Sequence, residues 1–557
     1  MSVKLPIDYH PPARPVGMLS MTEARAALMP HRHTAVHDLA VQRLLAIVAA
    51  LIAILSVYTM RIADPDLWGH LRYGRLFWEK GSVRVADPFA FTSAGLTWHT
   101  HEYLSQILLW LSYAQAGVVG LILLKCVVGG VTVYVLYRTI RLGSDDAPLW
   151  APILMLTASL VSRFFLFRPQ IFTFLFFAIF LLILLRHTFS QKTHLWVLPP
   201  LLALWANLHG GFIAGIGAVG LVLALCLLQS YHYHRWNLRA IWRDTRPLAV
   251  LLAACVAASL LTPSGWRIWP YLLTELTNPY NRRFIREWQP IDLTAPGWSG
   301  ACFMLLAALL IAAWGLAQRR VATIAGLRPW HWLLSCLPLS VMAFASERHI
   351  PLATLWIAPV LALLAQAAWN ARPARSAMNV GLLLATCVMS MPAIFGAIIT
   401  VADPWPRIRL TVDSLGAEHP MGAVAFMRVN RLQGRVYTPP WWGSYLTWEL
   451  YPDVLVSSDN RHVTLFPLEL VGEHQRFYNL EQADVEAPLS RASDFLLMPA
   501  STPILPRVRA DRRWTAIYDD GQAILFVRAD EDHAHILRRH RTGQLQQPQE
   551  PPPVWFQ

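Results

Sequence analysis

The sequence predicts an α-helical polytopic membrane protein with about eleven spans and a small C-terminal α/β domain. Of its 557 residues, 55% are hydrophobic and 15% are charged, and the mean hydropathy is +0.38. Soluble domains carry about 25% charged residues. The apolar residues fall into a succession of runs, many of them near the length that crosses a bilayer. From residue 403 onward, the composition changes to mixed charge with short β-rich stretches.

The N-terminal part predicts a tail, a first span and a long polar loop. Residues 1–41 contain several prolines and scattered basic residues, which is typical of a disordered tail. The first apolar run covers 42–61, and a polar loop at 62–116 follows it. Within this loop, residues 103–114 place apolar side chains at helical spacing, which predicts a helix lying in the membrane interface.

Ten further apolar runs complete the predicted transmembrane domain at 42–402. They cover 117–139, 149–166, 170–186, 195–209, 212–230, 248–262, 298–317, 331–346, 351–369 and 379–401. An odd number of spans places the two termini on opposite sides. The loops on the N-terminal side are short and rich in arginine, which favours a cytoplasmic N-terminus and an extracytoplasmic C-terminus. We therefore expect a multi-pass protein of the cell (inner) membrane, with the loop 62–116 outside the cytoplasm.

The C-terminal part predicts a sheet-containing domain at 403–530. Five β-rich stretches are separated by turn residues, which predicts a small α/β domain on the extracytoplasmic face. They cover 435–437, 453–457, 495–498, 515–518 and 523–527. Residues 531–557 are rich in His, Arg, Gln and Pro and predict a disordered tail.

Charge and cysteine content exclude two functional classes. The net charge is +13, but the basic residues lie mostly in short loops between apolar runs, where they set topology and contact anionic lipids. With no nucleic-acid-binding motif, we expect membrane lipids rather than nucleic acid as partners. The six cysteines all fall inside apolar runs without metal-ligand spacing, which argues against a disulfide framework or a zinc site.

Asp64 and Asp66 are the first candidate site residues, because they stand where the first span ends. Acidic side chains at a bilayer surface are costly unless they have a partner or a task. An Asp-x-Asp pair can supply two oxygens to a hard cation, or one ligand and one general base. Pro65 predicts a turn or extended backbone and hence a loop position. A solvated helix end is the alternative.

Further charged turns are predicted on the same face. Glu102 follows His99 and His101 and could orient or accept a proton, or could simply begin a helix. Arg168 and Arg348 could bind phosphate oxygens or lipid head groups. His209 precedes two glycines, which allow close approach of a ligand. A transporter would more often bury charge at mid-membrane depth, so this asymmetry favours chemistry on a lipid-borne, phosphate-containing substrate.

Several of these segments resemble known proteins. The segments are Asp64-Pro-Asp-Leu-Trp-Gly-His70, Asp87-Pro-Phe-Ala-Phe-Thr92, His101-Glu102, Arg168-Pro-Gln170 and Trp205-Ala-Asn-Leu-His-Gly-Gly211. In these segments the chain resembles the GT-C superfamily of integral-membrane glycosyltransferases, and in particular a bacterial GT-C-like group without an assigned substrate. Trp441-Trp442-Gly443-Ser-Tyr445 is similar to the tryptophan motif of oligosaccharyltransferase catalytic subunits, although the Asp of that motif is absent here.

The resemblance implies an inverting glycosyl transfer from a sugar on a polyprenyl phosphate or diphosphate. Asp66 or Asp64 would act as the base, with Glu102 as a further catalytic candidate. Arg168, His209 and Arg348 would hold the leaving phosphate, and Trp441, Trp442 and Tyr445 would contact the acceptor. With a diphosphate donor, Asp64, Asp66 and Glu287 would bind Mg²⁺ or Mn²⁺.

Two further functions fit parts of the sequence. One is a non-catalytic lipid or polysaccharide transporter, or an envelope assembly component. The other is a receptor-like role in which the domain at 403–530 carries the function. The sequence names neither the sugar nor the acceptor.

Overall fold

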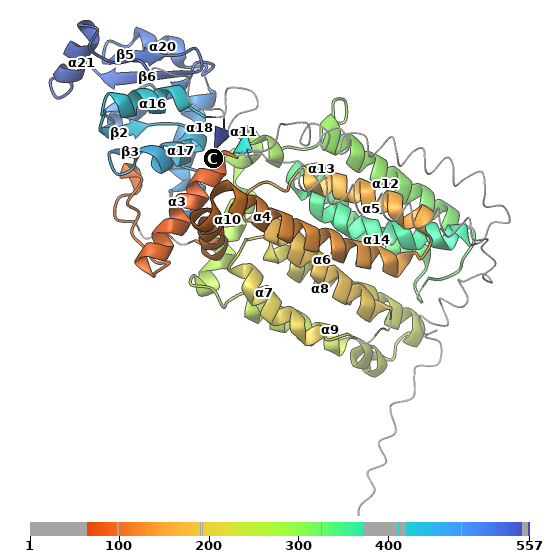
Figure 1. Ribbon diagram of the computed structural model, residues 1–557. Helices are drawn as coiled ribbons and strands as arrows, with labels where there is room; N and C mark the ends of the chain where they lie inside the picture. The colour runs from red at the N-terminus through yellow and green to blue at the C-terminus, as the bar shows by residue number, and fades with distance from the viewer. Residues whose placement is uncertain are drawn as a thin grey trace, which may run out of the picture.

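The computed structural model describes residues 64–370 and 419–548, apart from Thr97, His99, Ser190, Lys192, Ala325 and Glu481, together with residues 410–411 and 555–556. The predicted tail 1–41 and the predicted spans 42–61 and 379–401 lie outside the described residues. Figure 1 shows a bundle of long helices with a small sheet domain at one end, beside helix α3.

Helix α3 (Pro65–Lys80) opens the described chain. Asp64 is its N-cap, and its side chain accepts a hydrogen bond from the backbone N–H of Asp66 at 3.0 Å. Pro65 stands at the first helical position, where its missing N–H costs nothing. The prediction that the Asp-Pro-Asp segment lies in a loop is therefore wrong, because Pro65 starts a helix rather than preventing one.

Helix α4 (Tyr103–Gly143) is two helices joined at a sharp kink. Gly117 has a φ of 57° and a ψ of −142°, a conformation that favours glycine. At Gly120, a Cβ atom would lie 1.9 Å from the carbonyl oxygen of Ser112, so the two segments pack closely. The predicted short helix before Gly117 and the crossing helix after it are both present.

The bundle consists of helices that overlap the predicted apolar runs, although the helix Leu238–Ala258 begins well before the predicted run 248–262. They are α5 (Ala147–Ser162), α6 (Gln170–Thr188), α7 (Leu198–Ala206), α8 (Phe212–His234), α9 (Leu238–Ala258), α12 (Gly297–Gln318), α13 (Pro329–Ala345) and α14 (Ile350–Trp369). Helix α14 packs against α4, α5, α12 and α13, and nearly all of its residues are buried. Because its side chains face other helices all round, it is apolar on every face.

Five segments in the described part of the chain are long and apolar enough to cross a membrane. They are Tyr103–Gly143, Gln170–Thr188, Phe212–His234, Gly297–Gln318 and Glu347–Trp369. Shorter apolar helices cover Ala147–Ser162, Leu195–Ala206 and Pro329–Ala345. The chain is thus a mostly helical membrane protein, and the count of eleven spans stays a prediction.

Short helices and 3-10 turns link the longer elements. They are α10 (Ile268–Thr277), α11 (Pro279–Phe284), and the 3-10 turns Phe91–Ser93, Leu195–Val197, Gly265–Arg267, Arg286–Trp288, Glu347–His349 and His462–Thr464. The backbone N–H of Glu347 donates to the carbonyl of Gln289 at 3.1 Å, so the turn before α14 is tied to the loop before α12.

The C-terminal domain is built on a five-stranded mixed sheet in the order β3-β2-β4-β6-β5. The strands are β2 (Gly434–Tyr437), β3 (Val454–Val456), β4 (Phe495–Pro499), β5 (Trp514–Asp519) and β6 (Ala523–Arg528). All five predicted β-rich stretches are strands. Around them lie α16 (Met421–Val429), α17 (Pro440–Leu450), α18 (Leu468–Asn479), α19 (Ala487–Ser490) and α20 (Leu505–Ala510), and β1 (Leu410–Thr411) pairs with β7 (Trp555–Phe556).

Helix α21 (Ala534–Arg541) lies in the predicted disordered tail and corrects that prediction. Ile536 is only 4% exposed, and the side chain of Asn430 bonds to the backbone of Gln546 in both directions at 2.9 Å. A single buried apolar residue, Ile536, among polar residues is too short a pattern to predict this helix from the sequence.

The sheet domain shares a hydrophobic core with α3 and the first half of α4. Trp68 of α3 donates its indole N–H to Nε2 of His419 at 2.7 Å, and Val456 of β3 donates to the carbonyl of Phe89 at 3.1 Å. Arg461 is fully buried between Asp459 and Asp87, with contacts of 2.6 and 2.7 Å. These contacts fix the sheet domain against the end of the bundle.

Candidate active site

A cavity of about 1240 Å³ opens where the bundle meets the sheet domain, and it has two chemically different ends. The polar end is lined by Asp66, His70, Glu102, Arg168, His209 and Arg348. The apolar end runs between α6, α8, α13 and α14 and is lined by Phe174, Phe177, Leu221, Leu339, Leu352 and Trp356. The first loop, three turns of the bundle and the sheet domain thus meet around one space.

Arg168 lies at the centre of the polar end. It stands directly before Pro169 at the start of α6, and its Nε and Nη2 donate to the two carboxylate oxygens of Asp64, each at 2.6 Å. Its Nη1 lies 3.1 Å from Asp66 and 3.7 Å from Glu287. The donors of Arg168 therefore face carboxylates rather than an open phosphate site.

The two aspartates differ in environment. The side chain of Asp64 is 8% exposed and that of Asp66 is 25% exposed toward the cavity. Burial raises the pKa of Asp64, but the charge and hydrogen bonds of Arg168 outweigh it, and the net pKa is lowered. Burial raises the pKa of Asp66 to about 7, and the charges of Asp64 and Glu287 add to this effect. Asp66 can therefore exchange a proton near neutral pH.

Glu102 lines the same polar end and stands directly before α4. Burial raises its pKa to about 8, and the charge of Asp66 adds to this effect. Its Oε1 is 3.5 Å from Nε2 of both His101 and His209. Glu102 is therefore mostly protonated at neutral pH, unlike Asp66.

His209 is held in a single tautomer. Its Nδ1 accepts the backbone N–H of Gly211 at 3.0 Å and lies 2.7 Å from the hydroxyl of Thr173. Because Nδ1 accepts, the ring proton of the neutral imidazole is on Nε2, which faces Glu102 and the cavity. Burial lowers the pKa of His209 well below its ordinary value, and nearby His101 and Arg348 add to this effect. His209 thus presents a neutral N–H donor.

The other histidines of this wall are also neutral. Burial lowers the pKa of His70 to about 3, and that of His101 to about 4. Gln106 donates from its amide to Nδ1 of His70 at 3.3 Å. His99, predicted beside them, lies outside the described residues.

Arg348 lies in the turn before α14 and lines the same end. Its guanidinium carbon is 4.1 Å from the ring centroid of Trp288, a cation–π contact that fixes its position. Within the part of the chain that the structure describes, no carboxylate forms an ion pair with Arg348. Its donors can therefore bind an anionic ligand.

The residues predicted to hold a metal do converge, but they converge on Arg168. Both oxygens of Asp64 accept from its guanidinium, and Asp66 and Glu287 contact the same group. No group of three His, Cys, Asp or Glu side chains among the described residues is placed to hold a metal ion. The arrangement at Asp64, Asp66 and Glu287 therefore does not fit Mg²⁺ or Mn²⁺.

The predicted acceptor-binding aromatics also need correction. Trp441 lines the cavity. Trp442 and Tyr445 are 1% and 8% exposed and belong to the core shared with α3, where Tyr445 packs edge-on against Trp68 at 5.2 Å between centroids. Their side chains are covered because α17 packs on α3, a contact that sequence reasoning did not predict.

Several cavity residues were not predicted from the sequence. They include Gln106, Glu275, His462 and Gln475. Buried polar atoms without a hydrogen-bond partner lie on Gln106 (Oε1), Glu275 (Oε2) and His462 (Nδ1). Such atoms in a cavity wall are available to bind water or a polar ligand. None of these residues stands in a distinctive local motif, so no sequence signal could have found them.

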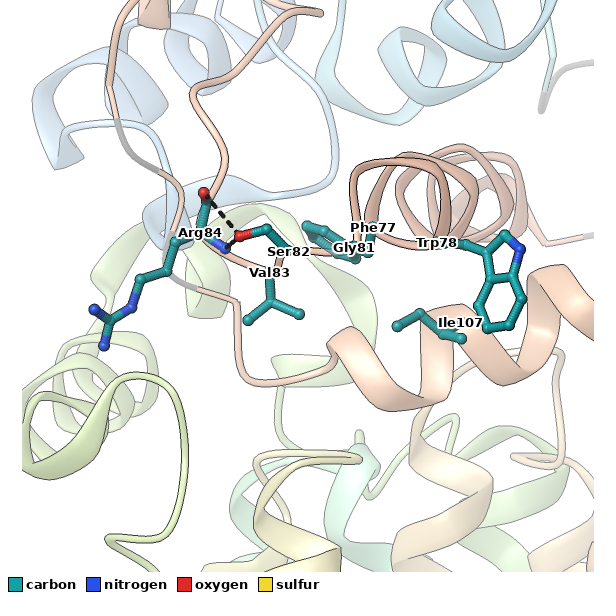
Figure 2. A pocket seen from close by; sticks show the side chains of 7 residues that line it. All are labelled: Phe77, Trp78, Gly81, Ser82, Val83, Arg84 and Ile107. Atoms are coloured by element: carbon teal, nitrogen blue, oxygen red, sulfur yellow. Dashed lines mark hydrogen bonds between the residues drawn. The ribbon is translucent and has the colours of Figure 1, made fainter.

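A second, shallower pocket of about 540 Å³ lies at the end of α3. Figure 2 shows its lining side chains, with the aromatic and aliphatic groups on one side and Arg84 pointing away. The residues are Phe77, Trp78, Gly81, Ser82, Val83, Arg84 and Ile107. It contains no carboxylate or imidazole and offers no acid–base chemistry.

Comparison with known proteins gives the fold. No protein-family model and no curated protein sequence matches the chain. Two structures of the oligosaccharyltransferase AglB from Archaeoglobus fulgidus match over 88% of this chain and 74% of theirs. One has a tethered acceptor peptide containing an NVT sequon (14% identity, TM-score 0.53), and the other has an inhibitory peptide and a dolichol-phosphate (13%, 0.54). ArnT from Cupriavidus metallidurans with undecaprenyl phosphate covers 89% of this chain and 99% of its own, at 12% identity and a TM-score of 0.44.

The AglB structures therefore match the fold of this chain over most of its length. The sequence identities are too low to carry more than the fold. The chain has a GT-C-like fold.

Proposed function

We propose that the chain is an inverting membrane glycosyltransferase, which moves a sugar from a polyprenyl-phosphate-linked donor to an extracytoplasmic acceptor. The observation that carries the proposal is the cavity with one polar and one apolar end. A polyprenyl chain fits the apolar groove between α6, α8, α13 and α14. The phosphate and sugar then lie at the end where carboxyl, imidazole and guanidinium groups meet. A GT-C-like fold supports this reading.

Asp66 is the proposed base. It takes the proton of the acceptor hydroxyl, and the acceptor oxygen forms a bond to the anomeric carbon of the sugar. The bond from this carbon to the phosphate oxygen breaks on the opposite side, and its electron pair leaves with the phosphate. A carboxyl group with a pKa of about 7 is well matched to this proton transfer at neutral pH.

Arg348 and His209 are the proposed phosphate ligands. Arg348 supplies a positive charge with available donors, and Nε2 of His209 supplies a neutral N–H donor. Both become more favourable as negative charge develops on the leaving phosphate. Asp64 is a positioning residue, because its two oxygens hold Arg168.

The topology expected from the sequence belongs to the same proposal. It comprises eleven spans in the cell (inner) membrane, a cytoplasmic N-terminus, and a C-terminal domain outside the cytoplasm. Trp441 at the cavity wall is the proposed acceptor contact. The acceptor class is a lipid, a glycan or a protein.

A transfer assay tests the proposal. The purified protein receives polyprenyl-phosphate and polyprenyl-diphosphate donors with radiolabelled sugar, and a pool of membrane lipids and glycans as acceptors. We expect label to leave the carrier with the wild type and not with Asp66→Asn, while Asp453→Asn in the sheet domain serves as the matched control. Full transfer by folded Asp66→Asn contradicts the assignment of the base. Donor binding by the wild type without any release of label favours a transporter.

A further inference from the structure

The three carboxylates predicted to bind a metal surround one guanidinium instead. The Asp64 side chain forms a bidentate pair with Arg168, with both N–O distances at 2.6 Å. Nη1 of the same guanidinium lies 3.1 Å from Asp66 and 3.7 Å from Glu287. One cationic group therefore contacts three carboxylates from two distant parts of the chain, with Asp64 and Asp66 at the start of α3 and Glu287 before α12.

At Asp64 these contacts use both of the oxygens that a cation would need, and at Asp66 and Glu287 one oxygen each lies near the guanidinium. Mg²⁺ and Ca²⁺ bind carboxylate oxygens at about 2.0–2.6 Å, in directions set by the lone pairs. The planar fork of Arg168 takes both oxygens of Asp64 in this way. Asp64 also accepts the backbone N–H of Asp66 at 3.0 Å, so its orientation is fixed by the start of α3 as well as by Arg168.

Arg168 itself is held firmly in this position. It precedes Pro169 at the N-terminus of α6, and its carbonyl accepts the backbone N–H of Ile171 at 3.2 Å. Its side chain is 22% exposed, so it is partly enclosed by the groups it contacts. A guanidinium stays charged throughout the physiological pH range.

We propose that Arg168 is a built-in cation that takes the place of a divalent metal ion among Asp64, Asp66 and Glu287. The guanidinium places one positive charge among the three carboxylates and orients Asp64, and the wild-type site binds no divalent metal. Removing the guanidinium while keeping the carboxylates converts the cluster into a metal site. If the chain has the proposed function, on which this last step rests, glycosyl transfer by the wild type needs no divalent metal.

Binding of Mn²⁺ measured by electron paramagnetic resonance tests the proposal without donor or acceptor. The full-length chain in detergent is compared as wild type, Arg168→Ala, Arg168→Ala/Asp64→Asn and Arg163→Ala. Arg163 is the matched control, because it is an exposed arginine in the same turn. We expect Arg168→Ala to bind one Mn²⁺ at least tenfold more tightly than the wild type, and Asp64→Asn to abolish this gain. The wild type and Arg163→Ala should show only background binding.

Two results overturn the proposal. One is a wild-type protein that binds one Mn²⁺ and loses it on Asp64→Asn. The other is a folded Arg168→Ala protein that binds no Mn²⁺, which would make Arg168 a purely structural partner. If Arg168→Ala does not fold, the wild-type measurement decides. Wild-type transfer in the presence of a chelator is measured separately, so a failure of glycosyl transfer is distinguished from a failure of the metal prediction.

Discussion

The pH dependence of glycosyl transfer follows from Asp66 and its neighbours. Burial and the charges of Asp64 and Glu287 raise the pKa of Asp66 to about 7. If Asp66 must be ionised to act as the base, kcat/KM follows its ionised fraction, which is about 0.5 at pH 7 and about 0.01 at pH 5. We therefore expect kcat/KM to rise about 50-fold from pH 5 to pH 7. An aspartate at its ordinary pKa would be ionised already at pH 5.

Glu102 predicts the other limb of the profile. Its pKa of about 8 means that it loses its proton as the pH rises above neutral. The new negative charge lies beside His209, where we propose that the donor phosphate binds. Repulsion between the two anions should then lower kcat/KM above about pH 8. The complete profile is a bell with limbs near pH 7 and pH 8.

Glu287→Gln perturbs this profile in a defined direction. It removes one of the carboxylates that raise the pKa of Asp66, so the acidic limb should move to lower pH. Glu473→Gln is the control, because Glu473 lies in the sheet domain and pairs with Arg491. The measurement is initial-rate transfer of labelled sugar at limiting donor between pH 5 and pH 9. A change of less than twofold from pH 5 to pH 7 in the wild type would refute the reasoning.

Three further predictions concern binding and stability. Arg348→Gln should lower kcat/KM for the donor by about 10- to 100-fold, because it removes one charge-assisted hydrogen bond. The measurement is the initial rate at limiting donor. An unchanged value would mean that Arg348 does not bind the phosphate. Gly217→Trp, on the cavity wall in α8, should block donor binding, whereas Gly315→Trp in α12 should not. Both substitutions have room, because a Cβ atom at either glycine has no neighbouring atom within 4 Å. Equal donor retention by the two variants would place the lipid elsewhere. Arg461→Met should lower the free energy of unfolding by about 3–5 kcal/mol, because it leaves Asp459 and Asp87 buried without their cation. Arg491→Met, in an exposed pair, should lower the free energy of unfolding by less than about 1 kcal/mol in the same thermal unfolding series. Equal losses in the two variants would show that burial of the pair is not decisive.

Local patterns were sufficient to predict most elements. The run at 351–369 is helix Ile350–Trp369, and the run at 298–317 is helix Gly297–Gln318. The strands were predicted from equally local signals, because β-rich stretches between turns need no distant information. The kink at Gly117 follows from a glycine at the end of one helical pattern. Such features depend on residues that are close in the sequence.

The candidate site depends on residues that are far apart. Asp64 and Arg168 are separated by 104 positions, and neither segment alone shows that the two side chains pair. Trp442 and Tyr445 were predicted to face the acceptor, but the packing of α17 on α3 buries them. At Pro65, a residue that can either end or begin a helix was interpreted as a loop signal, although the N-cap Asp64 makes it a beginning.

The central claim is that the two-ended cavity is the donor site. A cryo-electron microscopy structure of the protein in lipid nanodiscs with polyprenyl phosphate tests it most directly. We predict that the phosphate contacts the guanidinium of Arg348 and Nε2 of His209, with the prenyl chain in the groove beside Leu221 and Trp356. Density for the lipid on another surface of the bundle, with the groove empty, would contradict the account.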